Sequence, residues 1–553
     1  MGAGSRRRVF SVTISSVLAL LAGGAAGKTV NIGPGDDLPG AIAALSAGDE
    51  LVLAGGTYSV SSRLSVGVSG AQGSPIVIRG ADGATATITR PDANQNTINV
   101  DSAQWVELRN LDVTGGSHGI RITDSSHVTI ADCHVHDTGD VGISANAPGS
   151  DYADLHFVHD QVDHTGGTGE GFYLGCNDDG CRIHDSVIEK NWVHDTKDNV
   201  SQGDGIEVKD GSYGNAIRDN VIHDTGYPCI IVYGNAGHGG VNTIERNAMW
   251  SCGDHGIQAA ADAVIQNNLI FSPASDGIHS QVHQSASPGN LQILHNTVIS
   301  NNAAYSASGV VGTILLANNA LYALGNAINL TGTLTGVTAT GNVGVGGVQG
   351  VSSGFSATGN AANDFVDVDF TAAHRNAYPK AGSALIAAGD PAHVVADDFD
   401  GTDRAGVADV GAYAYKAGGA PAWPVAPGFK DTSAIPASGG APGAGGAAGT
   451  GGADATGAGG ASAGGGSGAG ASGGNTGGGA GGAAGGSSTG GSGTTGGASG
   501  VDGGSAAPGA AKDDGGCGCR VADHTSDANS YAGLVLGAAA FLRRRARKPR
   551  SER

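Results

Sequence analysis

Short alternations of apolar and polar residues recur along most of the chain, and glycines separate them. In residues 202–220, Ile206 and Val208 alternate with polar neighbours, as expected of a strand that buries one face. Two glycines then mark a turn, and residues 216–217 begin a second short strand that leads to Asn220. The pattern predicts short strands joined by tight turns.

Nine copies of this pattern follow one another at intervals of 21 to 31 residues, each built around one central residue. Constant strands at a variable spacing indicate a coil in which only the loops change length. Units this small bury their apolar faces only by stacking. Four consecutive central asparagines predict an inward ladder of side-chain amides. The central residues are Leu111, Cys133, Asp160, Asn191, Asn220, Asn247, Asn268, Thr297 and Asn319.

The repeated pattern xxIxxNxIxxxxxxGI resembles that of secreted right-handed parallel β-helix proteins of the pectate-lyase-like superfamily. The resemblance covers residues 28–415. It implies an all-β, single-stranded right-handed parallel β-helix, that is, a solenoid. Residues 36–45 have helical apolar spacing, and we expect them to cover the open end of the coil as an N-terminal helical cap. The fold alone leaves the reaction undetermined.

Changes in composition divide the rest of the chain. Three arginines, an apolar run and small residues at the start are typical of a secretory signal peptide. A long stretch without large side chains predicts a disordered, flexible tether. The predicted parts are a signal peptide (1–27), a cap with the first coils (28–104), the coil proper (105–350), a closing segment (351–417), a disordered Pro/Gly/Ala/Ser-rich linker (418–516) and a cysteine-containing tail (517–553).

The tail combines Cys517 and Cys519 with a short apolar run, residues 531–542, and a cluster of arginines. Twelve residues are short for a full membrane span. The arrangement is similar to the myxobacterial MYXO-CTERM sorting tag, in which a cysteine marks processing and anchoring. The resemblance implies export, recognition by sorting machinery and attachment at the outer cell surface.

The formal charge of −21 excludes some partners. Because many of the basic residues lie at the two ends, the central body is more negative still and should repel nucleic acid and anionic lipid. An acidic polysaccharide would need a basic patch or a bridging cation to bind. We expect a monomer.

Five of the seven cysteines lie within the coil. Cys176 and Cys181 bracket a small loop and could close it, and Cys229 and Cys252 lie in neighbouring coils and could pair. Cys133 occupies the inward ladder position, where we expect a buried free thiol.

Aligning the Gly-Ile pairs that begin one strand of each repeat places polar residues in outward columns. Glu170, Asp204 and Glu207 converge in two adjacent coils, where their charges would repel one another. A hard cation such as Ca²⁺ would relieve the repulsion. Lys209 lies on the same face, where a lowered pKa would make it a general base. The predicted substrate-binding residues in the columns are Arg121, Tyr173, Gln258 and His279.

The run IEVKDGSYGN, with Glu207, Lys209, Ser212 and Asn215, resembles the calcium-dependent β-helix lyases of the alginate lyase and chondroitinase B type. The resemblance implies β-elimination on a uronic-acid polymer, with Lys209 as base and Tyr233 or His255 as acid. Tyr233 lies near the position of an arginine in that family.

Two other functions remain open: a non-catalytic carbohydrate-binding or adhesion module, and a glycoside hydrolase that uses Glu170 and Glu207. A surface ion pair is an equal alternative for Glu207 and Lys209. The repeated Val-His-Asp-Thr motif, which includes His136, recurs in several coils, and a structural role is expected for it.

Overall fold

The computed structural model describes residues 27–197, 202–284 and 286–431. The signal peptide up to residue 26, the linker from residue 432, and Cys517 and Cys519 in the tail lie outside the described residues. No helix in the described ranges is long and apolar enough to cross a membrane.

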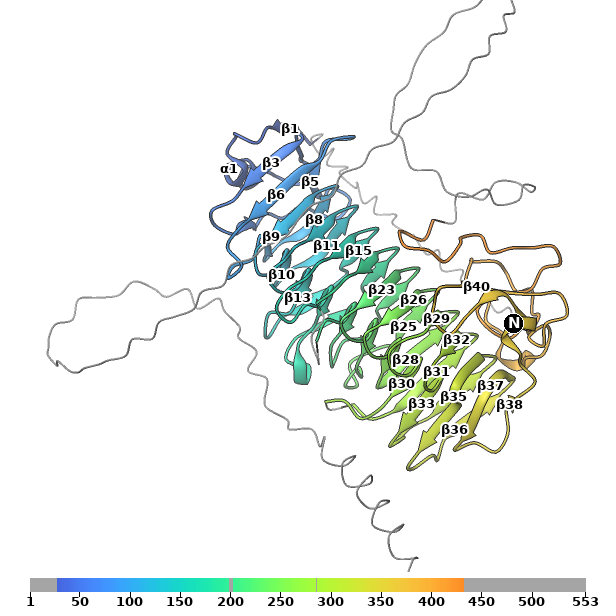
Figure 1. Ribbon diagram of the computed structural model, residues 1–553. Helices are drawn as coiled ribbons and strands as arrows, with labels where there is room; N and C mark the ends of the chain where they lie inside the picture. Colours follow the sequence, from blue (N-terminus) through green and yellow to red (C-terminus); the bar gives the residue numbers. More distant parts are fainter. Residues whose placement is uncertain (1–26, 198–201, 285, 432–553) are drawn as a thin grey trace, which may run out of the picture. The chain divides into compact units, whose positions relative to one another are not determined.

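The described chain forms a parallel β-helix, whose strands repeat as rungs of three faces (Figure 1). The first face is a 13-stranded sheet. Its strands, in order, are β1 (Thr29–Ile32), β2 (Glu50–Leu53), β5 (Ile76–Gly80), β8 (Gln104–Arg109), β11 (Ser126–Ala131), β15 (His156–Val158), β19 (Val187–Glu189), β22 (Ala216–Arg218), β25 (Asn242–Glu245), β28 (Ala261–Gln266), β31 (Gly289–Leu294), β34 (Ile314–Ala317) and β36 (Val337–Thr340).

Two further runs of parallel strands make the other faces. The second face contains β3 (Gly56–Ser59), β6 (Ala86–Arg90), β9 (Asp112–Gly115), β12 (His134–His136), β16 (Gln161–Asp163), β20 (Trp192–His194), β23 (Val221–Thr225), β26 (Ala248–Cys252), β29 (Leu269–Phe271) and β32 (Thr297–Ser300). The third face contains β4 (Leu64–Val66), β7 (Ile98–Asp101), β10 (Ile120–Thr123), β13 (Ile143–Ala145), β17 (Phe172–Leu174), β21 (Ile206–Val208), β24 (Ile230–Val232), β27 (Ile257–Ala259), β30 (Ile278–Ser280) and β33 (Tyr305–Ser308). The long strand β35 (Ala320–Thr331) pairs with both β32 and β33, and β37 (Asn342–Gln349) and β38 (Phe355–Ser356) follow it.

Period-2 alternation fills the interior, as the sequence predicts. On the third face one inward column is apolar in every rung and fully buried, and parallel pairing keeps its members in register. The column consists of Ile120, Ile143, Phe172, Ile206, Ile230, Ile257 and Ile278. The residues that alternate with this column point outward, and they include the candidate site residues.

A buried amide ladder runs beside the first face. From Asn220 onward, each asparagine accepts hydrogen bonds through its Oδ1 from the backbone N–H and the side-chain amide of the asparagine in the preceding rung, as Asn220 does from Asn191 at 2.9 and 3.0 Å. The alignment places Thr297 at the central position of its repeat, but Thr297 pairs with Leu269, and the amide that bonds Asn268 is that of Asn296. The ladder consists of Asn191, Asn220, Asn247, Asn268, Asn296, Asn319 and Asn342.

The N-terminal end of the coil carries α1 (Leu38–Ala43), the helix that the sequence predicts there. Asp37 caps it by accepting a hydrogen bond from the backbone N–H of Gly40, and Leu38 and Ile42 are buried. The helix therefore covers apolar side chains of the first coils.

The C-terminal part folds back onto the second face. It contains α2 (Ala361–Asp364), an antiparallel pair of β39 (Phe365–Val368) and β40 (Arg375–Pro379), and η2 (Pro391–His393). Its Tyr413 and Trp423 join a buried apolar cluster with Trp250 and Tyr322. The prediction that the linker begins at residue 418 is wrong, because residues 418–431 lie against the coil. There Trp423 is buried, and Lys430 donates a hydrogen bond to Asp219.

Candidate active site

Three carboxylates meet on the outside of the third face. Glu207 is the middle residue of β21, and Asp204 lies two residues before that strand. Glu170 stands at the equivalent place before β17, the neighbouring rung. Alternation points Ile206 and Val208 inward, so the side chain of Glu207 must point outward.

The three carboxylates converge and are buried. One ligand atom from each side chain lies within 4.8 Å of the other two. Their exposed fractions are 0% for Glu170 and 3% for both Asp204 and Glu207. Glu170 Oε1, Asp204 Oδ1 and Glu207 Oε2 have no hydrogen-bond partner among the described residues. Each carboxylate therefore has one buried oxygen without a hydrogen-bond partner in the part of the chain that the structure describes.

Burial and mutual repulsion shape the charge of this cluster. Burial, aided by the charge of Glu207, raises the pKa of Glu170 to about 7. The same causes raise the pKa of Asp204 well above its usual range. Oxygen ligands held close together in this way suit a hard divalent cation such as Ca²⁺. The residues present therefore fit a calcium ion.

Polar neighbours outside the cluster orient Glu170. The Thr168 hydroxyl lies 2.6 Å from Glu170 Oε2 and 2.8 Å from Asp140 Oδ1. This arrangement leaves Oε1 of Glu170 as the free ligand atom. Thr168 and Asp140 lie in loops outside the Gly-Ile alignment, so the repeat pattern did not predict them as site residues.

Lys209 and Tyr233 contact the cluster through Glu207. Lys209 Nζ lies 2.5 Å from Glu207 Oε1 and 4.4 Å from the centroid of the Tyr173 ring. The Tyr233 hydroxyl donates to the same oxygen of Glu207 at 2.8 Å and lies 3.4 Å from Lys209 Nζ. The structure thus brings together the predicted base, one predicted acid and the metal candidates.

The electrostatic state of Lys209 differs from the expectation of a lowered pKa. Burial alone would lower it, but the adjacent Glu207 carboxylate outweighs burial and raises the pKa of Lys209 above its usual range. The pKa of Tyr233 is also raised, by burial and then by Glu207. Without a cation, Lys209 is an ammonium paired with Glu207.

The outward columns that the sequence predicts are covered at this site. Glu207, Lys209, Tyr233 and Gln258 are each no more than 6% exposed. His283, in the loop after β30, stacks on the Tyr233 ring at 4.5 Å and lies 3.0 Å from its hydroxyl. The repeat pattern could not predict His283 as a site residue, because a loop of variable length brings it to Tyr233 from another rung.

The predicted substrate-binding residues lie in one column, but they are spread along it over several rungs. Parallel pairing orders Arg121, Ser144, Tyr173, Glu207, Ile231, Gln258 and His279 along it. Arg121 and His279 therefore lie three rungs to either side of Glu207, or about 14 Å at about 4.8 Å per rung.

His255 lies in a separate cluster with His279 and Asp276. The two imidazole rings stack at 4.1 Å, and His255 Nδ1 accepts from the backbone N–H of Asp276. Tyr233, and not His255, contacts Lys209.

Two disulfides cross-link the chain near the site. Cys176–Cys181 closes the loop after β17 that contains η1 (Asn177–Asp179), and Cys229–Cys252 joins adjacent rungs next to β24. Cys133 is a buried free thiol within the described coil.

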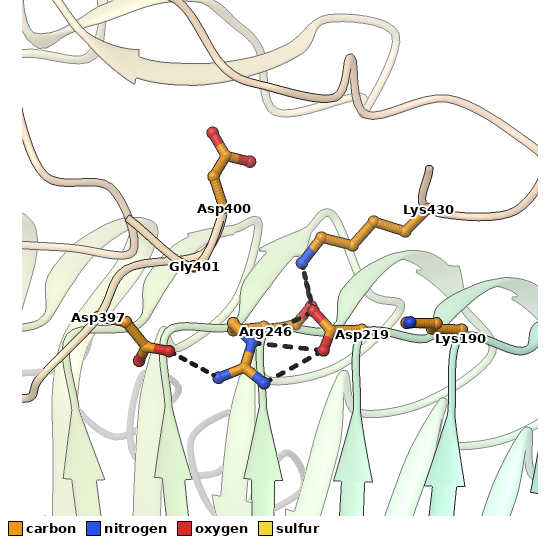
Figure 2. Close-up of a pocket in the computed structure, with 7 residues that line it drawn as sticks. All are labelled: Lys190, Asp219, Arg246, Asp397, Asp400, Gly401 and Lys430. Atoms are coloured by element: carbon orange, nitrogen blue, oxygen red, sulfur yellow. Dashed lines mark hydrogen bonds and ion pairs between the residues drawn. The ribbon is translucent and has the colours of Figure 1, made fainter. Parts of the chain in front are cut away.

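A cavity of about 240 Å³ lies elsewhere, between the coil and the C-terminal segment (Figure 2). Figure 2 shows Arg246 between Asp219 and Asp397, with Lys430 above Asp219. Lys190 and Asp400 also line it. Arg246 pairs with Asp397 and Lys430 pairs with Asp219 across the seam, so the cavity is best explained as part of the attachment of that segment.

The coil and its carboxylate cluster define an all-β parallel solenoid with an acidic centre on one face. The chain belongs to the Pel9A-like right-handed β-helix family, whose model matches residues 21–312. A search of curated proteins found no match.

Solved structures are similar at low identity. Pectate lyase Pel9A is 16% identical, with 71% of this chain and 97% of that chain covered and a TM-score of 0.46. An alginate lyase from Paenibacillus sp. str. FPU-7 is 19% identical, with 60% and 97% covered and a TM-score of 0.34. The A-module of a mannuronan C-5 epimerase from Azotobacter vinelandii is 16% identical, with 56% and 91% covered and a TM-score of 0.34.

Proposed function

We propose that the protein is a calcium-assisted lyase that cleaves an acidic, uronic-acid polysaccharide by β-elimination. The observation that carries the proposal is the set of three buried carboxylates, each with one unpartnered oxygen, directly beside a buried lysine. Membership of the Pel9A-like family supports a polysaccharide as the substrate class.

Glu170, Asp204 and Glu207 would hold the ion through their unpartnered oxygens. When bound, calcium would neutralise the carboxylate of the substrate and acidify the proton on C5. A cation bound to Glu207 would weaken the attraction between the Glu207 carboxylate and the Lys209 ammonium, and the pKa of Lys209 would fall. Lys209 Nζ then removes the C5 proton, and the C4–O bond breaks as the C4–C5 double bond forms.

Tyr233 is the proposed acid. Its hydroxyl carries its proton at neutral pH, as tyrosine ordinarily does, and burial raises its pKa further. The hydroxyl lies 3.4 Å from Lys209 Nζ. Tyr233 would donate that proton to the departing oxygen. Tyr173, on whose ring Lys209 lies, would position the lysine. We assign Arg121, Gln258 and His279 to more distant sugar units of the polymer.

We further propose that the protein is exported and held at the outer cell surface. The signal-like start and the Cys517 and Cys519 tail support this localisation.

The test is to incubate the purified protein with alginate, pectate, chondroitin and heparin, with calcium or with a chelator. A lyase produces unsaturated uronates, which absorb in the ultraviolet, and the chelator should abolish that signal. Reducing ends without the absorbance would favour the hydrolase reading, with Glu170 and Glu207 as the carboxylate pair. Neither product would favour a binding module.

Lys209→Ala should lower the rate of elimination by about 10²–10⁴-fold, the usual contribution of a general base. The matched control is Lys190→Ala, which removes an exposed lysine from another part of the coil. Full activity in Lys209→Ala, with the fold intact by circular dichroism, would remove Lys209 from the mechanism.

A further inference from the structure

The geometry points to a second metal site, on the second face, for a zinc-like divalent transition ion. Its ligands would be Asp112 in β9 and His134 and His136 in β12. This inference does not depend on the proposed lyase function. His134 and His136 stand two residues apart in one strand, so both side chains leave the same face. Asp112 pairs with His134 in register and faces them from the neighbouring rung.

The spacing of the three ligand atoms matches a tetrahedral ion. Asp112 Oδ1 lies 3.4 Å from His134 Nδ1 and 3.1 Å from His136 Nε2. One ligand atom of each side chain lies within 4.8 Å of the other two. Metal–ligand distances of about 2.0–2.1 Å place tetrahedral ligands about 3.3 Å apart. One ion can therefore lie among these atoms after small movements.

Every outer atom of the three ligands already has a partner. Thr87 donates to Asp112 Oδ2 at 2.7 Å. Asp163 lies 2.8 Å from His134 Nε2, and Asp137 lies 2.7 Å from His136 Nδ1. Without an ion, the inner nitrogens contact Asp112 Oδ1, and carboxylates beside the outer nitrogens can hold the ring protons there when the inner nitrogens give up theirs to a metal. This second layer of contacts is characteristic of metal-bound histidines.

The site has the donor set and the access of a zinc centre. Two imidazoles and one carboxylate favour zinc and its neighbours, whereas calcium prefers oxygen ligands alone. Side-chain exposures of 37% for His134 and 20% for both His136 and Asp112 leave room for water as the fourth ligand. The two rings stack at 4.1 Å and must turn about χ2, a broad torsion, for both lone pairs to meet one ion.

A similar cluster on the first face supplies a matched control. His127 and His156 both bond Asp154, but to different oxygens: His127 Nδ1 to Oδ2 at 2.7 Å and His156 Nε2 to Oδ1 at 2.8 Å. The carboxylate thus lies between the rings, and the two nitrogens do not share one acceptor atom. The residue types are alike, but His156 and Asp154 are more exposed than His136 and Asp112, and the nitrogens of the control cluster do not converge on one oxygen.

The experiment is a calorimetric titration of Zn²⁺ into the full chain, freed of metal and then saturated with Ca²⁺. Cys517→Ser and Cys519→Ser are included in all variants so that the tail thiols do not bind the added zinc. We expect one zinc site per chain and a raised melting temperature. His134→Ala and His136→Ala should each weaken binding by 100-fold or more, whereas His127→Ala and His156→Ala should leave it unchanged.

Two further variants separate the loss of a metal ligand from misfolding and from the loss of one negative charge. Asp112→Asn keeps the size of the side chain and should also weaken zinc binding, and Asp137→Asn should weaken it by about 10–100-fold through the orientation of His136. Cobalt in place of zinc should show the visible absorption of a tetrahedral ion in wild type and lose it in His136→Ala. Equal losses in the His127 and His156 variants, or unchanged zinc binding in Asp112→Asn, would overturn the proposal.

Discussion

At the scale of single residues, burial decides what each carboxylate does. Asp160 is fully buried at the start of the amide ladder, where its Oδ1 accepts from the backbone N–H of Cys133. Its Oδ2 has no hydrogen-bond partner in the described ranges. Burial raises the pKa of Asp160 well above its usual value. The ladder favours an amide at this position.

Asp160→Asn should therefore stabilise the protein by about 1–3 kcal/mol, because an amide donates where a carboxylate oxygen is left unpaired. The raised pKa means that folded Asp160 binds more protons than unfolded Asp160, so its contribution to stability is lost as pH rises above about 3.9. The gain from Asp160→Asn should thus be larger at pH 7 than at pH 4. Urea denaturation at both pH values measures it, and a destabilised Asp160→Asn protein would contradict the assignment.

The columns of the third face were predictable from the sequence, because Glu170, Asp204 and Glu207 follow directly from the Gly-Ile alignment. Their burial was not predictable, since it depends on loops. The position of His283 and the raised pKa of Lys209 arise from contacts between rungs whose loop geometry no periodicity fixes.

At the scale of elements, the amide ladder links successive rungs. Asn220 accepts from the backbone N–H and amide of Asn191, and it donates to Ile188 O and to Asn247 Oδ1. The repeat spacing predicted this ladder but missed Asn296, since His295-Asn296-Thr297 places the amide one residue before the expected position. The pairing of Leu269 with Thr297 and the hydrogen bonds of Asn268 to Asn296 show the register.

Asn220→Ala should lower the free energy of unfolding by about 3 kcal/mol or more, because it leaves several buried donors and acceptors without partners. Chemical denaturation compares it with wild type. Asn94→Ala, in an exposed loop, is the control and should change stability little. Equal stability of Asn220→Ala and wild type would show that the ladder contributes nothing.

At the scale of the described molecule, the C-terminal segment completes the coil. Arg404 is 2% exposed and donates to the backbone oxygens of Gly411 and Ala412 and to Asn267 Oδ1 in the coil. The sequence identified the closing segment as a change of pattern. It did not show that the segment continues to residue 431, because the anchors Trp423 and Lys430 are isolated among small residues.

Arg404→Ala should destabilise the protein by about 3 kcal/mol or more, since several buried acceptors lose their donor at once. We also expect faster cleavage within residues 365–431 by limited proteolysis. Arg63→Ala, which removes an exposed arginine, provides the comparison. Unchanged proteolysis in Arg404→Ala would mean that the apolar cluster alone holds the segment.

The most direct test of the central claim is a calorimetric titration of Ca²⁺ into the protein and its Glu207→Gln variant. Glu189→Gln is the matched control, because Glu189 is an outward glutamate of the first face that pairs with Arg218. We predict one calcium site in wild type and in Glu189→Gln, and its loss in Glu207→Gln. Calcium binding that is unchanged in Glu207→Gln, or absent from wild type, would contradict the assignment of the three carboxylates as a metal centre.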